Sequence, residues 1–286
     1  PLAASAGFAH DDARVPAPAA SSSTPSGPTV DPRAPSRPSV VRLGLGPVSL
    51  VVCAALFYAL HWPMAGVVVV ALSLLLASIW VGPLVDRSKA ALDRDLLRLL
   101  ATGKPRELLA RVQAARLFVL LGAPGEVAER QGRAHRAAGD RAAALAGYRR
   151  ALAGYAGGRA PLAVVAGLGH AAYEAGDFAL AAPALEAAHR ASPDLPELAA
   201  RLAHVTLARR GQDAGDVEMP RASDGETARI VLALVALRRG DGEPARAALT
   251  EIPDDDTAAW ALARRDLATE VASKSTPSRR KRKKKR

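Results

Sequence analysis

Glycine recurs at nearly regular intervals between residues 103 and 240, and this feature constrains the fold most. The glycines that separate amphipathic stretches are Gly103, Gly139, Gly176, Gly211 and Gly240, spaced by 36, 37, 35 and 29 residues. Each interval has room for two helices, and the abundance of alanine favours helix. A period of this length built from paired helices is typical of a helical solenoid. The sequence therefore predicts an all-α fold.

Two consecutive repeats carry similar residue types at equivalent positions, 37 residues apart. The equivalent pairs are Gly132 and Gly169, Ala144 and Ala181, Tyr148 and Leu185, and Ala151 and Ala188. This pattern resembles the tetratricopeptide repeat (TPR) family. The resemblance implies that the small residues let paired helices approach closely and that the larger residue fills the gap against the next repeat. The chain departs from the family at Ala128 and Val165, where a large aromatic residue is usual.

The repeat domain is expected to cover residues 86–272. Beyond the two clear repeats, helices are expected at Pro196–Arg210, Glu226–Arg239, Glu243–Glu251 and Thr257–Ala272, with a polar loop at 211–224. The units at both ends match the pattern less well. This is expected for a solenoid, because the outer faces of its terminal units meet water or a partner.

Residues 43–85 contain no Asp, Glu, Lys or Arg. As one helix they would be about 65 Å long, roughly twice the ~30 Å hydrocarbon core of a membrane. Pro63 and the preceding His61-Trp62 favour a turn at the midpoint. We predict a transmembrane helical hairpin with spans at about 43–60 and 64–81. The alternatives are one span with a re-entrant arm, or a buried pair of core helices.

Basic residues flank this stretch on both sides. Arg33, Arg37 and Arg42 precede it, and Arg87 and Lys89 follow it, while the midpoint carries no charge. The positive-inside bias then places both termini in the cytoplasm. The expected localisation is a membrane, as in a bacterial inner-membrane protein.

Both ends of the chain have the composition of disordered segments. Residues 1–42 are rich in Pro, Ala and Ser and predict a disordered tether. Residues 273–286 predict a disordered polybasic tail. Of the net charge of +11, nine units come from residues 274–286, and residues 86–273 carry only +1. A basic nucleic-acid-binding domain is therefore not expected.

No motif for catalysis or metal binding is present. The chain has no P-loop, no Gly-x-Ser-x-Gly and no His-Glu-x-x-His. Its single cysteine excludes an intrachain disulfide and a cysteine-based zinc site. Asp254, Asp255 and Asp256 are interpreted as the N-cap region of a following helix. We therefore predict no enzyme activity, no catalytic residue, no metal and no cofactor.

Binding is the remaining class of function. The resemblance implies a groove lined by the first helix of each repeat, which would present Glu129, Arg133, Arg136, His170, Tyr173 and Arg201 to a protein or peptide partner. The arginines would suit an acidic peptide, and Tyr173 offers an amphipathic contact. The alternative is that these are ordinary solvated surface residues.

The polybasic tail suggests a second type of contact. Its consecutive basic residues are Arg279, Arg280, Lys281, Arg282, Lys283, Lys284, Lys285 and Arg286. They would bind anionic lipid headgroups of the bilayer, bind nucleic acid without sequence preference, or only improve solubility. The expected function is a membrane-anchored TPR-like scaffold that docks a partner on the cytoplasmic side. The alternatives are a tail-driven nucleic-acid- or ribosome-associated membrane protein, or an accessory subunit of a membrane enzyme.

Overall fold

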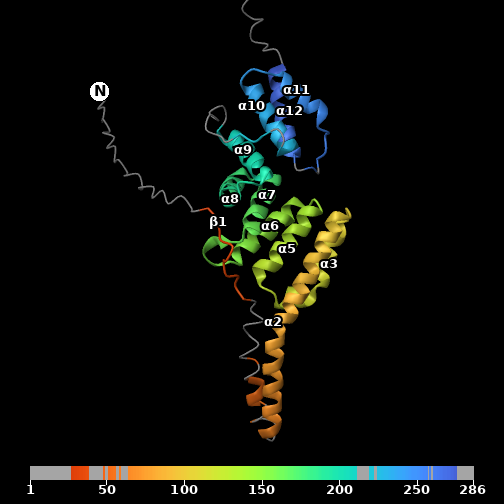
Figure 1. Cartoon of the computed structure of the whole chain (residues 1–286), viewed down its shortest axis with the longest axis vertical. Helices are drawn as coiled ribbons and strands as arrows, with labels where there is room; N and C mark the ends of the chain where they lie inside the picture. The colour runs from red at the N-terminus through yellow and green to blue at the C-terminus, as the bar shows by residue number, and fades with distance from the viewer. Residues whose placement is uncertain are drawn as a thin grey trace, which may run out of the picture.

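The computed structural model describes residues 27–38, 48, 51–55, 58, 64–210, 219–221, 224–256, 258 and 260–275 of the 286. Apart from two short paired strands, the regular elements of the described part are helices, which confirms the all-α prediction. The helices stack one after another along a curved α-solenoid, from the long helix α2 to the C-terminal helix α12 (Figure 1).

The helices pair as the repeat predicts, with α5 against α6 and α7 against α8. Their bounds are α2 Met64–Ala101, α3 Pro105–Ala114, α4 Arg116–Leu121, α5 Pro124–Ala137, α6 Arg141–Ala153, α7 Leu162–Glu174, α8 Phe178–Ala191, α9 Pro196–Arg210, α10 Glu226–Arg238, α11 Glu243–Glu251 and α12 Ala261–Ser275. A short 3-10 helix at Ala156–Gly158 connects α6 to strand β2, Arg159–Ala160.

The Gly-Asp pairs form the turns within the two clear repeats. Gly139 and Gly176 adopt left-handed backbone angles, with φ of 81° and 76°, which glycine tolerates without a steric penalty. The side chain of Asp140 then accepts a 3.0 Å hydrogen bond from the backbone of Ala143, and Asp177 caps α8 in the same way. One dipeptide therefore ends one helix and begins the next.

Tyr148 of α6 fills the space between the two repeats. A Cβ added at Gly132 of α5 would lie 3.1 Å from its ring, and one added at Gly167 of α7 would overlap the ring. Leu185 of α8 packs against Gly169 in the equivalent position. The close approach of helices over glycine, with a larger residue between them, is the packing that the repeat pattern predicts. The α-solenoid prediction is confirmed.

The second predicted membrane span is only part of a longer helix. The helix α2 begins at Met64, as expected, but continues through Pro83 and the charged residues after Val85 as far as Ala101. Leu92 and Leu96, in its second half, are buried in a core shared with α3 and α4. The charge-free window of the sequence therefore does not coincide with a separate structural unit.

Among the residues that the structure describes, no helix has the length and apolar character needed to cross a membrane. This finding contradicts the predicted membrane localisation with both termini in the cytoplasm, and it leaves the predicted transmembrane hairpin without support. Most of the first predicted span, 43–60, lies outside the described residues.

Residues 27–38, here called the N-terminal strap, lie against the solenoid, although the sequence predicted a disordered tether over 1–42. Strand β1, Thr29–Val30, pairs in parallel with β2. The amide of Arg37 donates to the carbonyl of Gly154 over 2.9 Å. Ala34 packs against the core formed by α7 and α8. Proline is compatible with such an edge position, because an edge strand leaves many backbone groups unpaired. Residues 1–26 and 39–42 lie outside the described part.

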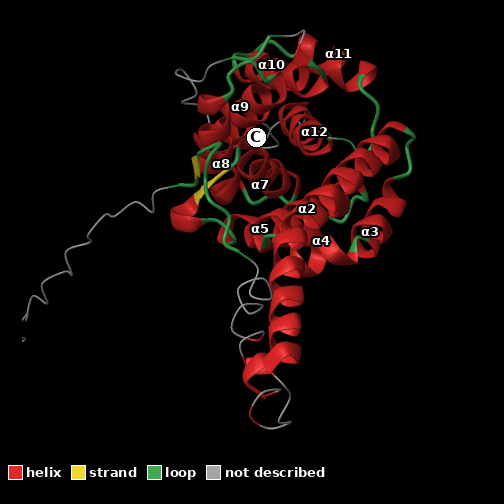
Figure 2. Cartoon of the chain, turned by 60° about the horizontal axis from the view of Figure 1, so that its bottom comes forward, coloured by secondary structure: helices red, strands yellow, loops and turns green. Residues whose placement is uncertain are grey.

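The C-terminal helix α12 lies inside the curve of the solenoid, with α7, α9 and α10 around it (Figure 2). Its Leu262 packs against the core that includes Tyr173 and Val205, and its Leu267 is buried in a core shared with α10. The helix begins at Ala261, four residues later than expected. It ends at Ser275, so residues 273–275 of the predicted tail are helical, and residues 276–286 lie outside the description.

Candidate functional site

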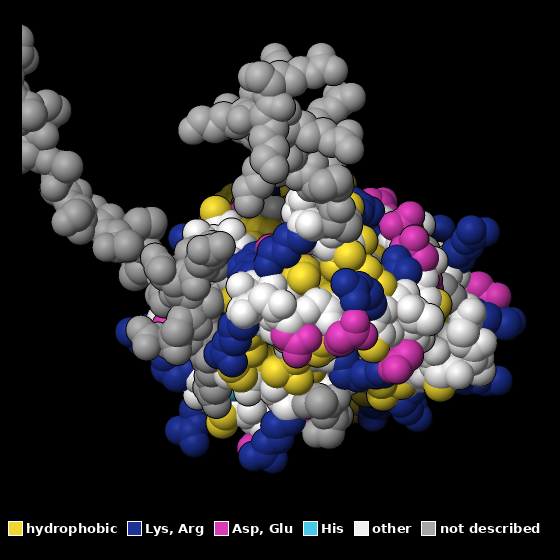
Figure 3. All heavy atoms as spheres, turned by 90° about the horizontal axis from the view of Figure 1, so that it is seen from above, with side chains coloured by type: hydrophobic (Ala, Val, Ile, Leu, Met, Phe, Trp, Pro, Cys, Tyr) yellow, Lys and Arg dark blue, Asp and Glu magenta, His cyan; other side chains and the backbone are white. Residues whose placement is uncertain are grey.

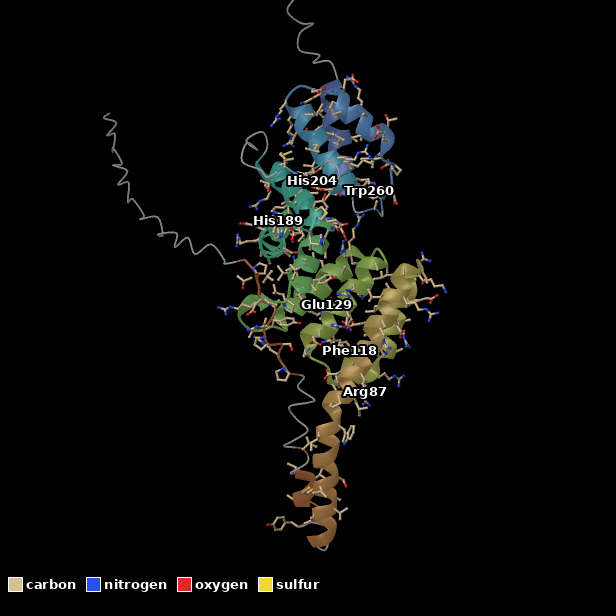
Figure 4. All side chains as sticks on the ribbon, viewed as in Figure 1. Arg87, Phe118, Glu129, His189, His204 and Trp260 are labelled. Carbon is tan, nitrogen blue, oxygen red and sulfur yellow. The ribbon has the colours of Figure 1, made fainter. Side chains whose placement is uncertain are left out.

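Three groups of charged and polar side chains link neighbouring helices of the solenoid, and the first lies between α2 and α5. Arg130 donates two 2.9 Å hydrogen bonds to the carboxylate of Asp93 and a third, of 3.0 Å, to Glu129. Arg133 bonds the other oxygen of Glu129 over 2.6 Å. Glu129, in the middle of the solenoid in Figure 4, is buried and already has two arginine partners. It therefore holds its neighbours in place and does not face a partner.

The second link joins α5, α7 and α9 through a shared carboxylate. Glu174 accepts a 2.9 Å hydrogen bond from Arg136 and a 3.0 Å hydrogen bond from Arg201. Burial lowers the pKa of Arg136, but the hydrogen bond and charge of Glu174 outweigh burial, so the pKa is raised. The side chain of Arg201 is only 1% exposed, and its guanidinium lies 5.3 Å from the centre of the Tyr173 ring. The carboxylate of Glu174 therefore compensates the positive charges of both Arg136 and Arg201.

The third link connects α7 and α9 to the C-terminal helix. The hydroxyl of Tyr173 lies 2.9 Å from Nδ1 of His204, and Nε2 of His204 lies 3.2 Å from Asp266 of α12. A neutral imidazole with its proton on Nε2 satisfies both contacts, with Tyr173 donating to Nδ1. Burial raises the pKa of Tyr173, which keeps the hydroxyl protonated. In Figure 4, His204 and Trp260 lie in the upper part of the solenoid, far from Phe118 of α4 and from Arg87, which lies partway along α2.

The structure therefore gathers the six predicted groove residues on neighbouring helices but gives them different roles. Glu129, Tyr173 and Arg201 are buried and serve the packing of the solenoid. Arg133 and Arg136 remain accessible, with side chains 37% and 30% exposed. Glu129, Tyr173 and Arg201 are therefore covered by neighbouring helices, and His170 is half-buried. Binding of a partner by the accessible residues stays a prediction. The basic tail residues 279–286 lie outside the described part.

A cavity of about 680 Å³ opens beside the accessible arginines. Its walls are Leu100, Arg133, Arg136, Ala137, Gly139, Asp140, Arg141, Glu174, Asp256 and Ala258. These residues come from the end of α2, the α5–α6 turn, the end of α7 and the loop before α12. The cavity therefore lies where the first repeats face the C-terminal segment across the inner side of the solenoid. We call it the inner cavity.

Sequence reasoning missed the residues that complete this site. Glu174 follows Tyr173 directly, and its charge on an otherwise apolar helix was the available signal. Arg141 lies directly after the Gly-Asp turn, and the sequence pattern there indicates only an ordinary exposed residue. Asp256 and Asp266 come from a segment more than 80 residues further along the chain, and nothing in the sequence indicates that it folds back.

The described residues contain no group of three or more His, Cys, Asp or Glu side chains placed to hold a metal ion. Within the wall of the inner cavity, Arg136 pairs with Glu174. Arg133 pairs with Glu129 outside the wall, and the guanidinium of Arg141 donates to the backbone carbonyl of Asp256.

His170 makes the stability of the solenoid depend on pH. Burial, followed by the charges of Arg201 and Arg136, holds the pKa of His170 well below its ordinary value of 6.5. Its Nδ1 atom is buried and has no hydrogen-bond partner. Below about pH 6.5 the unfolded chain binds a proton here that the folded chain does not. The free energy of unfolding therefore falls as the pH drops below that value.

We expect the substitution His170→Gln to reduce this loss. Between pH 7.5 and 5.5 the variant should lose up to about 1 kcal/mol less unfolding free energy than the original chain. Urea-induced unfolding of both proteins at the two pH values measures the difference. The other histidines are common to both proteins and cancel in the comparison. Equal pH dependence in the two proteins would contradict the assignment.

Comparison of the chain with family models, with curated proteins and with solved structures finds no match. The resemblance to the TPR family therefore rests on the residue pattern alone.

Proposed function

We propose that this protein is an α-solenoid scaffold of the TPR-like kind that docks a peptide or protein partner in the inner cavity. The observation that carries the proposal is the cavity itself, with the accessible side chains of Arg133 and Arg136 in its wall. Concave surfaces with a few polar groups in fixed positions are where proteins generally bind ligands, and repeat proteins use their concave faces in this way. An acidic segment of the partner fits the arginines best.

The arginines are well suited to specific docking because they are held in place. Arg133 is fixed by Glu129, and Arg136 is fixed by Glu174. Side chains that are ordered before binding lose little conformational entropy when the partner arrives. Their remaining donors can therefore contribute to affinity.

The main alternative is binding of nucleic acid, and the charge of the described surface gives it little support. On the C-terminal face, Lys and Arg side chains alternate with Asp and Glu and do not form a continuous basic patch (Figure 3). Nucleic-acid binding of the sequence-independent type requires clustered positive charge. This face of the described part therefore does not favour sequence-independent binding of nucleic acid.

Binding of a fluorescein-labelled acidic peptide to the full chain tests the proposal. The basic residues 279–286 are first replaced by serine and glycine, so that the tail does not bind the peptide by itself. Relative to this background, Arg133→Gln is expected to weaken binding by about tenfold, equivalent to one charge-assisted contact of about 1.4 kcal/mol. Fluorescence anisotropy gives the affinities.

The matched control is Arg246→Gln on α11, an exposed arginine paired with Glu243 outside the cavity. It should leave binding unchanged. Loss of all peptide binding on replacing the tail, together with tail-dependent binding of an RNA homopolymer, would refute the proposal and favour the nucleic-acid alternative.

A further inference from the structure

A second cavity, of about 650 Å³, lies between α4, α5 and α6 and is bordered by the N-terminal strap. It shares no wall residue with the inner cavity. On α5, Gln131 lines this cavity and Arg133 lines the inner one, and two positions in a helix correspond to about 200° around its axis. The two cavities therefore open on different faces of α5. We call the second one the α4–α6 cavity, and its walls are Arg37, Pro38, Val119, Leu120, Gly122, Pro124, Val127, Ala128, Gln131, Arg150, Ala153 and Gly154.

The helix α4 supplies apolar surface that the protein core does not use. Five of its six residues are apolar, but only Phe118 is fully buried. Val119 and Leu120 remain 37% and 61% exposed, and both line the cavity. Val127 and Ala128 of α5 extend the apolar part of the wall. Such a concave surface favours an apolar ligand, because binding removes the apolar area from water.

The charge of the described wall is entirely positive. It contains two arginines, Arg37 and Arg150, and no acidic residue. In the part of the chain that the structure describes, no carboxylate pairs with either guanidinium. The Nε atom of Arg150 donates to the carbonyl of Ala146 over 3.4 Å, which leaves its two terminal nitrogens for another acceptor. Two uncompensated positive charges therefore lie beside an apolar wall.

The N-terminal strap brings these two arginines to the same cavity. The amide of Arg37 donates to the carbonyl of Gly154 over 2.9 Å, and Ser36 forms an antiparallel bridge with Tyr155. Gly154 follows Arg150 by about one helical turn, or about 6 Å along the axis. The backbone of Arg37 is thus held about one turn away from that of Arg150, and both residues line the cavity.

We propose that the α4–α6 cavity binds an aliphatic carboxylic acid, with its chain against Val119 and Leu120 and its carboxylate at the two arginines. Guanidinium groups pair well with carboxylates. A peptide with an apolar C-terminal residue has the same carboxylate, but its backbone polar groups need partners when they are buried. Gln131 is the only neutral polar side chain in the described wall, so the wall fits a chain without polar groups better. This site is additional to the proposed docking in the inner cavity and does not depend on it.

Isothermal titration calorimetry with sodium decanoate tests the class of ligand. The protein is the full chain in which residues 279–286 are replaced by serine and glycine, so that the tail does not attract the anion. Decanoate is expected to bind at a single site. Butyrate keeps the carboxylate and shortens the chain, and decyltrimethylammonium keeps the chain and reverses the charge. Each is expected to bind at least about tenfold more weakly than decanoate. The peptide acetyl-Ala-Ala-Leu with a free carboxylate is also expected to bind more weakly.

The substitutions Arg150→Gln and Arg149→Gln form a matched pair that tests the position of the site. They change the net charge equally at adjacent residues of α6, but Arg149 pairs with Asp177 and does not line the cavity. Arg150→Gln is expected to weaken decanoate binding by about tenfold, and Arg149→Gln should leave it unchanged. Leu120→Ser should weaken it by about fivefold, because an apolar contact is lost. Arg133→Gln, in the inner cavity, should have no effect. Circular dichroism melting checks that each variant is folded.

Three results would overturn the proposal. The first is the absence of saturable decanoate binding, or equal affinity in Arg150→Gln and Arg149→Gln. The second is tighter binding of the peptide than of decanoate, which would show that the cavity recognises a chain terminus. The third is loss of decanoate binding in Arg133→Gln, which would place the ligand in the inner cavity. The acidic-peptide experiment has its own readout, so the docking function and this site can fail independently.

Discussion

Replacing Glu174 with glutamine is expected to lower the free energy of unfolding by about 3 kcal/mol, because two buried or half-buried arginines lose their shared carboxylate. Arg136 and Arg201 both bond Glu174, and no other carboxylate oxygen in the described part lies within 3.5 Å of the Arg201 guanidinium. Glutamine keeps the shape of the side chain and removes only its charge. The cost therefore reports the electrostatic role of Glu174.

Chemical denaturation with urea measures this effect, and Glu197→Gln is the matched control. Glu197 also approaches Arg201, but at 3.7 Å and with a side chain that is 64% exposed, so its removal should cost less than about 1 kcal/mol. The combination Glu174→Gln/Arg201→Met should recover part of the stability, because the uncompensated buried cation is gone. A loss for Glu174→Gln no larger than for Glu197→Gln would contradict the shared-carboxylate role.

Tyr148 is expected to give the largest effect of a packing substitution. Its side chain is almost completely buried between α5, α6 and α7. The substitution Tyr148→Ala leaves a cavity at the junction of the two repeats and should cost about 3–5 kcal/mol. That amount is a large fraction of the stability of a typical domain. Thermal or urea unfolding followed by circular dichroism measures the loss.

A double-mutant cycle with Gly167 shows whether the effect comes from this contact. Gly167→Ala alone should also destabilise, because its Cβ would overlap the Tyr148 ring. In a Tyr148→Ala background the same change should be nearly neutral or stabilising, since the space is then empty and alanine favours helix. Additive effects of the two substitutions would show that the ring and Gly167 do not touch in solution.

The sequence predicted the helices and their ends well where the deciding interactions are local. The helices Pro196–Arg210 and Glu243–Glu251 begin and end where expected. The Gly-Asp turns could be predicted because a left-handed glycine and a capping aspartate act within a few residues. The fit of Tyr148 over Gly132 and Gly167 could be anticipated because it repeats with the period of the pattern.

The expectations that failed depend on contacts between distant segments. Composition alone suggested disorder for residues 27–38, but this segment pairs with a strand 130 residues further along the chain. The charge-free window 43–85 suggested a membrane hairpin, but its second half belongs to a helix that continues into the repeat domain. Of the six predicted groove residues, Glu129, Tyr173 and Arg201 are buried by neighbouring helices.

The sequence by itself therefore determined the all-α class, the repeat and the positions of most turns, because these follow from periodicity and from short-range backbone chemistry. Only the tertiary structure decided which charged residues stay accessible and which become buried partners. The curvature of the solenoid brings Asp256 and Asp266 next to residues that precede them by 62 or more positions. A cavity between segments that are distant in the sequence depends on the packing angles of all the helices between them. No local sequence pattern predicts the sum of these angles.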